Sequence, residues 1–81
     1  MIFIDVRTKE EWGEGHLEGA IHLPIESIMD GVLPDLPKDT EIALYCRSGG
    51  RAGMAQEILR RNGFENTKNL GGLEDAKKYL I

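Results

Sequence analysis

The strongest constraint on the fold is an apolar segment that leads directly into a cysteine, a glycine-bearing turn and a helical pattern. Residues 41–45 read IALY after the first residue, and Cys46 follows without a spacer. A short apolar run of this kind is typical of a strand buried on both faces. Beyond the turn, the apolar residues of 55–59 fall on one face of a helix that Gly63 would end. The segment therefore predicts a strand, a tight turn and a helix in succession.

Strands and helices are expected to alternate along the whole chain. Short apolar stretches at residues 1–4, 20–23 and 66–70 predict three further strands, and residues 26–29 and 73–80 predict helices. Thr8 and Glu11 have the spacing of a capping box, so another helix should begin there and stop by the glycines at 13 and 15. This alternation favours an α/β fold with a central parallel sheet of about four to five strands and helices on both faces. Such sheets bind ligands at the C-terminal ends of their strands.

Length and composition indicate one ordinary folded domain. The chain has 81 residues, of which 41% are hydrophobic and 30% charged, so we expect residues 1–81 to form a single domain with one core. Ten Lys and Arg against fourteen Asp and Glu give a net charge of -4, which argues against nucleic acid or an anionic membrane as partner. No apolar run approaches the roughly 20 residues that cross a bilayer. We expect a monomer that is cytoplasmic as the sequence stands, and periplasmic if an export signal has been removed.

The chain contains one cysteine and two histidines. A lone cysteine excludes an internal disulfide, and one cysteine with two histidines falls short of the ligand set of a structural zinc site. A lone cysteine is often a small core residue. A polar, glycine-bearing loop flanked by arginines favours a functional thiol at Cys46 instead.

The turn after Cys46 has the features of an anion-binding site. A short loop that runs from a strand end straight into a helix must curl, which turns backbone N–H groups toward its centre. The helix N-terminus adds unpaired donors and about half a positive charge. Together with neighbouring arginines, these groups should lower the thiol pKa from about 8.5, so that the thiolate prevails near neutral pH. Gly49 and Gly50 would supply the positive φ angles and close backbone approach that the loop needs.

Two arginines lie within residues 42–56, a stretch that contains no Asp or Glu. The guanidinium groups of Arg47 and Arg51 can bind a doubly charged oxyanion in bidentate fashion and hold it beside the sulfur. We favour Arg51 over Arg47, whose side chain can point outward. Ser48 and the two glycines are expected to complete the substrate site around a small anion.

Other polar residues are assigned structural roles. His16 and His22 could act as general bases, but nothing in the sequence places them near the cysteine. Asp5 and Arg7 could be catalytic, although a buried or half-buried ion pair that holds the first turn is the preferred interpretation. Trp12 is interpreted as a packing residue.

Nearly the whole chain resembles the rhodanese family. Residues 4–7, which read IDVR, resemble the start of its N-terminal signature. Cys46, Gly49 and Arg51 match its C-x-x-G-x-R active loop, which is common in single-domain members of the phage shock protein E type. Further positions that resemble the family signatures are Glu10, Glu11, Gly15, His16, Gly19, Ala20, Pro24, Gly63, Phe64, Leu70, Gly71 and Gly72. The chain departs from the family at residues 75–77, where a tryptophan often follows the paired glycines.

The resemblance implies a rhodanese-like fold and a thiosulfate sulfurtransferase that needs no metal or organic cofactor. The Cys46 thiolate would attack the outer sulfur of thiosulfate, release sulfite and form a persulfide. The persulfide sulfur would then pass to cyanide or a thiol, including a thioredoxin-like or other protein thiol. The loop N–H groups would stabilise the persulfide anion, and Arg51, with Arg47 assisting, would bind the thiosulfate oxygens.

Two other functions are considered. A cysteine-dependent phosphatase or arsenate reductase also uses a cysteine, an N–H cradle and an arginine, but its arginine comes one residue later than here, where four residues separate Cys46 from Arg51. The loop also has no aspartate to act as general acid. A persulfide carrier that hands sulfur to a protein partner would use the same loop and turn over cyanide weakly, since the fold alone does not specify an activity.

Overall fold

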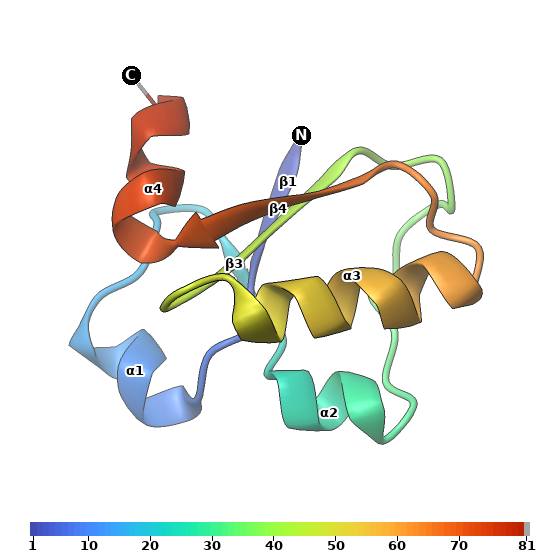
Figure 1. Cartoon of the computed structure of the whole chain (residues 1–81), viewed down its shortest axis with the longest axis horizontal. Helices are drawn as coiled ribbons and strands as arrows, with labels where there is room; N and C mark the ends of the chain where they lie inside the picture. The colour runs from blue at the N-terminus through green and yellow to red at the C-terminus, as the bar shows by residue number, and fades with distance from the viewer. Residues whose placement is uncertain (81) are drawn as a thin grey trace.

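Four short strands form one parallel sheet. This confirms the predicted α/β fold, for which four to five strands were expected. In the computed structural model, which describes residues 1–80, these strands are β1 (Ile2–Asp5), β2 (Ile21–His22), β3 (Ile42–Cys46) and β4 (Thr67–Gly72). Their order across the sheet is β2-β1-β3-β4, and all neighbours are parallel. The helices are α1 (Lys9–Glu14), α2 (Ile25–Met29), α3 (Gly50–Arg61) and α4 (Leu73–Lys77), followed by a 3-10 turn, η1 (Lys78–Leu80) (Figure 1).

Side chains of β3 alternate between two apolar cores, one on each face of the sheet. Ile42, Leu44 and Cys46 belong to the first core, whereas Ala43 and Tyr45 belong to the second, because successive strand side chains point to opposite faces. Both cores are buried, which explains why β3 is continuously apolar. Helices α2 and α3 pack against each other over the first core, and α4 covers the second (Figure 1). Cys46 therefore points to the face that α3 covers.

Helix α1 begins at the capping box expected from the sequence. Thr8 Oγ1 accepts a hydrogen bond from Glu11 N at 3.2 Å, and Thr8 N donates to Glu11 Oε1 at 3.0 Å. The helix continues through Gly13 and ends at Glu14, where Gly15 takes a φ of 142°. Of the two expected stop residues, Gly15 is the one that ends the helix.

The ends of the strands differ from the expected ones by one or two residues. The largest difference is in β4, which extends to Gly72 because this residue pairs with Cys46 after a register shift. The helix predicted over residues 73–80 is present, but it is α-helical only to Lys77: its last three residues tighten into η1, as helix ends often do. Within residues 1–80, no helix combines the length and the apolar character needed to cross a bilayer.

Candidate active site

Strand β3 carries Cys46 to the C-terminal edge of the sheet, where the sequence analysis places it. The residue is 1% exposed and contributes to the core beneath α3. Burial alone would suit an inert core cysteine. The polar contacts of the sulfur therefore decide between a core thiol and a functional one.

Backbone N–H groups surround the sulfur of Cys46. Gly49 N donates a hydrogen bond to Cys46 Sγ at 2.8 Å, and α3 begins at the next residue. Burial raises the pKa of the Cys46 thiol, but hydrogen bonds from the backbone N–H groups of Ala52, Ser48, Gly49 and Arg51 outweigh it and hold the pKa below its ordinary value. The loop and the first turn of α3 thus stabilise the thiolate through their backbone.

One glycine in the left-handed region gives the loop its curl. Gly49 has a φ of 97°, and a Cβ there would lie 3.3 Å from Gly71 Cα. Gly50 has no positive φ, and a Cβ there would meet no atom within 4 Å, so the expected need for glycine is confirmed at Gly49 and wrong at Gly50. Asn69 links the loop to β4: its Nδ2 donates to Gly49 O and its Oδ1 accepts from Gly71 N, both at 2.9 Å. Nothing in the local sequence pattern predicts this bridge.

The end of β4 passes very close to the active loop. Gly72 pairs with Cys46, and a Cβ on Gly72 would collide with the carbonyl oxygen of Arg47. Only glycine permits this approach. Gly72 N also donates to Asp75 Oδ2 at 3.2 Å, in the first turn of α4. The start of α4 is thereby placed beside the loop.

The Arg51 side chain is held by a glutamate from another helix. Arg51 Nη1 donates to Glu11 Oε1 at 2.6 Å, and Arg51 Nη2 donates to Glu11 Oε2 at 3.0 Å. The hydrogen bond from Arg51, reinforced by those from Thr8 and opposed by burial, lowers the pKa of Glu11 to about 2. The pKa of Arg51 is raised, mainly by its hydrogen bonds to Glu11. The nearby charges of Cys46 and Asp5 raise it further. The sequence indicates Glu11 as a capping residue and as a position of the family signature, but does not predict its contact with Arg51, which is a finding of the structure.

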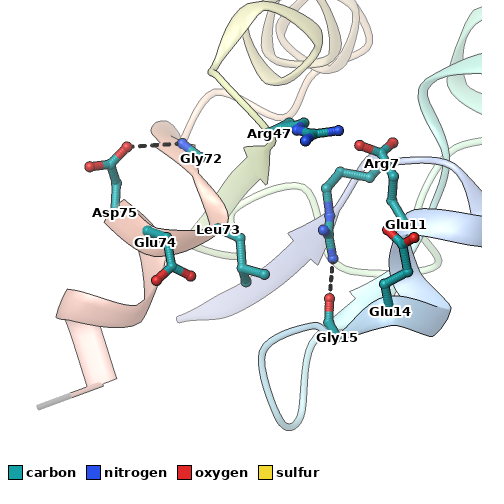
Figure 2. A pocket seen from close by; sticks show the side chains of 9 residues that line it. All are labelled: Arg7, Glu11, Glu14, Gly15, Arg47, Gly72, Leu73, Glu74 and Asp75. Carbon is teal, nitrogen blue, oxygen red and sulfur yellow. Dashed lines mark hydrogen bonds between the residues drawn. The ribbon is translucent and has the colours of Figure 1, made fainter.

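A pocket of about 410 Å³ lies beside the loop (Figure 2). Arg47 extends into it from the end of β3, toward Arg7 and Glu11 (Figure 2). Within residues 1–80 Arg47 forms no ion pair, so its guanidinium is available to an anion. Cys46 does not line the pocket, since its sulfur lies under the loop, one residue away from Arg47. The lining residues are Arg7, Glu11, Glu14, Gly15, Arg47, Gly72, Leu73, Glu74 and Asp75.

The ion pair expected between Asp5 and Arg7 is present and buried. Arg7 Nη2 donates to Asp5 Oδ2 at 2.8 Å, and Arg7 N donates to Asp5 Oδ1 at 2.8 Å. Arg7 Nη2 also donates to Gly15 O at 2.6 Å, which places the guanidinium on the pocket wall (Figure 2). The sequence does not predict that Arg7 lines the pocket, because Gly15 approaches Arg7 only in the folded chain.

Both histidines make structural contacts with Trp12 and Arg7. The Trp12 ring stacks with His16 at 3.4 Å between centroids and with His22 at 4.8 Å. His16 Nδ1 forms a hydrogen bond with Trp12 O, and His22 Nε2 forms one with Arg7 O, both at 2.8 Å. These contacts agree with the structural roles expected for the three rings. In the part of the chain that the structure describes, no three His, Cys, Asp or Glu side chains are grouped to hold a metal ion.

Known proteins match the chain over nearly its whole length. Residues 1–78 match the family model of the rhodanese-like domain. Thiosulfate sulfurtransferase PspE of Escherichia coli K12 is 35% identical over 74 residues, which cover 90% of this chain and 71% of that protein. A sulfurtransferase of Allochromatium vinosum is 33% identical over 72 residues, which cover 89% of this chain and 66% of that protein. The tRNA sulfurtransferase of Desulfurococcus amylolyticus is 42% identical over 72 residues, but these make up only 14% of its length.

Solved structures have the same fold. A rhodanese-like domain from Anabaena sp. superposes with a TM-score of 0.84 at 32% identity, and the match covers 98% of this chain and 92% of that one. A rhodanese with anions from E. coli superposes with a TM-score of 0.77 at 35% identity, covering 91% of this chain and 88% of that one. Residues 1–78, which match the family model, include Cys46 and the loop that follows it. The chain belongs to the rhodanese family of sulfurtransferases.

Proposed function

We propose that this chain moves sulfane sulfur from thiosulfate to cyanide or a thiol acceptor through a persulfide on Cys46. The observation that carries the proposal is the hydrogen bond from Gly49 N to Cys46 Sγ at 2.8 Å, within a ring of N–H donors from the loop and α3. These donors favour the thiolate, which is the reactive form of a cysteine nucleophile. They are also suited to stabilise the negative charge of a persulfide.

The transfer consists of two displacement steps. The Cys46 thiolate attacks the outer sulfur of thiosulfate; a new S–S bond forms to Cys46, the S–S bond of thiosulfate breaks, and sulfite leaves with the electron pair. The persulfide anion then gives its outer sulfur to cyanide, which becomes thiocyanate, or to a thiolate, which becomes a persulfide. The Cys46 thiolate is regenerated, so atoms and charge balance without a cofactor.

The two loop arginines are proposed to hold the oxyanion of the donor. Arg47 extends into the pocket (Figure 2), and Arg51, which is not a lining residue, donates to Glu11, which is one. Guanidinium groups bind sulfonate-like oxygens through paired N–H donors. Sulfite would thus leave from the pocket while the transferred sulfur stays in the cradle formed by Ser48, Gly49 and the first turn of α3.

The enclosed position of Cys46 favours a sulfur donor over a phosphate ester. The residue is 1% exposed, and its N–H donors close on the sulfur itself. A terminal sulfur atom can approach through a narrow opening, whereas a phosphorus centre must bring its oxygens to the same place. The spacing of four residues between Cys46 and Arg51 also favours a sulfur donor over a phosphate ester. A phosphatase or arsenate reductase is therefore the less well supported function.

Intact-protein mass spectrometry tests the proposal. The purified chain is measured after thiosulfate and again after cyanide, with Cys46→Ser as the variant that cannot form the persulfide. We expect one added sulfur mass on the unsubstituted chain, its removal by cyanide, and no addition to the variant. Sulfur uptake by Cys46→Ser would contradict the mechanism. An unsubstituted chain that takes up no sulfur but hydrolyses p-nitrophenyl phosphate would be a phosphatase instead.

A protein thiol is the second candidate for the acceptor. Larger sulfurtransferases contain a region similar to this chain as a small part of their length, which favours a unit that passes sulfur on to another protein surface. The discriminating measurement compares sulfur transfer from the loaded chain to reduced thioredoxin and to cyanide. Faster transfer to thioredoxin would favour a persulfide carrier, and faster transfer to cyanide a small-molecule acceptor.

A further inference from the structure

The contact between Glu11 and Arg51 joins two residues that are 40 positions apart in sequence, one in α1 and one in α3. Helix α1 follows β1 and helix α3 follows β3, and these two parallel strands are neighbours in the sheet. The C-terminal ends of neighbouring parallel strands meet at one edge, so the first turns of the two helices come together there. Their side chains form a partly buried pair, with 16% of the Glu11 side chain and 32% of the Arg51 side chain exposed.

The carboxylate of Glu11 is held independently of Arg51. Glu11 Oε1 accepts hydrogen bonds from Thr8 N at 3.0 Å and from Thr8 Oγ1 at 3.1 Å, within the capping box of α1. Arg51, in contrast, has a long side chain whose free rotation would otherwise be lost on binding an anion. The restrained carboxylate of Glu11 therefore determines where the flexible side chain of Arg51 lies.

The bidentate contact restrains the guanidinium without using all of its donors. One N–H of Nη1 and one of Nη2 point to Glu11, which leaves the remaining N–H groups of Arg51 for another acceptor. Arg51 lies in the first turn of α3, two residues after Gly49, whose N–H donates to Cys46 Sγ at 2.8 Å. The restrained guanidinium thus extends from the turn that holds the nucleophile, and its charge interacts with that of the thiolate.

We propose that Glu11 is a positioning residue that holds the Arg51 guanidinium beside Cys46, so that the free N–H groups of Arg51 receive the anionic group of the reacting partner. That this partner is a sulfur donor rests on the function proposed above; the positioning itself does not. A positioning role makes the opposite prediction to simple charge repulsion. Repulsion predicts that removal of the Glu11 charge improves the use of an anion, whereas positioning predicts that it impairs it.

Alkylation of Cys46 provides a test that does not depend on sulfur chemistry. Iodoacetate and iodoacetamide both react with the thiolate by displacement of iodide, but only iodoacetate carries a carboxylate for Arg51. The ratio of the two rates cancels changes in thiolate fraction and in helix stability. It is measured for the unsubstituted chain, Glu11→Gln, Arg51→Ala and the double variant. Glu10→Gln is the matched control, because Glu10 is an exposed glutamate of the same helical turn.

We expect Arg51→Ala to lower the ratio of iodoacetate to iodoacetamide rates by about tenfold, the usual worth of a charge-assisted hydrogen bond. Glu11→Gln should lower it in the same direction, and should have no further effect in the Arg51→Ala background. Glu11→Asp keeps the charge but shortens the side chain, so it should also lower the ratio. A higher ratio in Glu11→Gln would overturn the inference, as would an equal fall in the presence and absence of Arg51.

Kinetics with thiosulfate separate this inference from the proposed function. Glu11→Gln should raise the KM for thiosulfate and leave the cyanide-dependent step of the loaded chain unchanged, a split that general loss of structure would not produce. If the unsubstituted chain takes up no sulfur while the alkylation pattern holds, the proposed function fails and the positioning role stands. If sulfur is taken up but Glu11→Gln leaves both the KM and the alkylation ratio unchanged, only the positioning role fails.

Discussion

Two adjacent glycines in the active loop offer a controlled test of how the loop is held. Gly49 has a φ of 97°, a conformation that costs an L-residue about 1–2 kcal/mol, and a Cβ there would press on Gly71 Cα at 3.3 Å. We therefore expect Gly49→Ala to lower the free energy of unfolding by about 2 kcal/mol. Gly50 has neither feature, so Gly50→Ala should leave this free energy unchanged or raise it by about 0.5 kcal/mol through the unfolded state.

Urea unfolding followed by circular dichroism measures both variants under the same conditions. In a domain of this size the melting temperature should fall by roughly 4–8 °C for each kcal/mol lost, which gives an independent thermal readout. Gly49→Ala should also slow alkylation of Cys46 at neutral pH, because the displaced N–H no longer supports the thiolate. Equal changes in unfolding free energy for the two variants would refute the reasoning, since they would show that the loop tolerates a side chain at both positions alike.

Two further predictions concern the ionised groups at the sheet edge. Because the N–H groups of the loop hold the pKa of Cys46 below its ordinary value, the rate of alkylation by iodoacetamide should rise with pH and level off at a lower pH in the folded chain than in the same chain in guanidinium chloride. The contribution of the thiolate to stability is then present above the unfolded pKa and is lost as pH falls through the folded one; coincident pH profiles for the two states would contradict this. Replacement of the buried Asp5 by asparagine should lower the unfolding free energy by about 3–5 kcal/mol, because Arg7 is left buried without its counter-charge. In urea unfolding, Glu57→Gln, which breaks only the exposed pair with Arg61, serves as the control, and an Asp5→Asn chain as stable as this control would show that the buried pair contributes nothing.

The unit around Cys46 could be predicted because its signals are local. The apolar run of β3 requires burial on both faces, and the polar, glycine-bearing residues that follow it suit a curled loop at the start of a helix. The capping box of Thr8 and Glu11 depends on residues three apart. Short-range patterns of this kind survive in the folded structure because the tertiary contacts agree with them.

The local sequence does not determine whether Gly49 or Gly50 takes a positive φ. Asn69 of β4 binds the carbonyl oxygen of Gly49, and Gly71 lies against the same residue, so the neighbouring strand selects Gly49. Likewise, the tightening of residues 78–80 into a 3-10 turn follows no sequence signal that distinguishes it from a continued helix. The choice of Gly49 depends on β4, which meets the loop only after the sheet has formed.

The sequence by itself determined the α/β class, the place of Cys46 at a strand end and the N–H cradle that follows it, because strand periodicity, glycines and caps act between near neighbours. Only the tertiary structure decided that Arg51 is held by Glu11 and that Arg7 reaches the pocket wall. The physical reason is the strand order β2-β1-β3-β4: it makes β1 and β3 parallel neighbours and so brings the residues that follow them to one edge of the sheet. Hydrogen bonds between side chains so far apart in sequence exist only once that order is established.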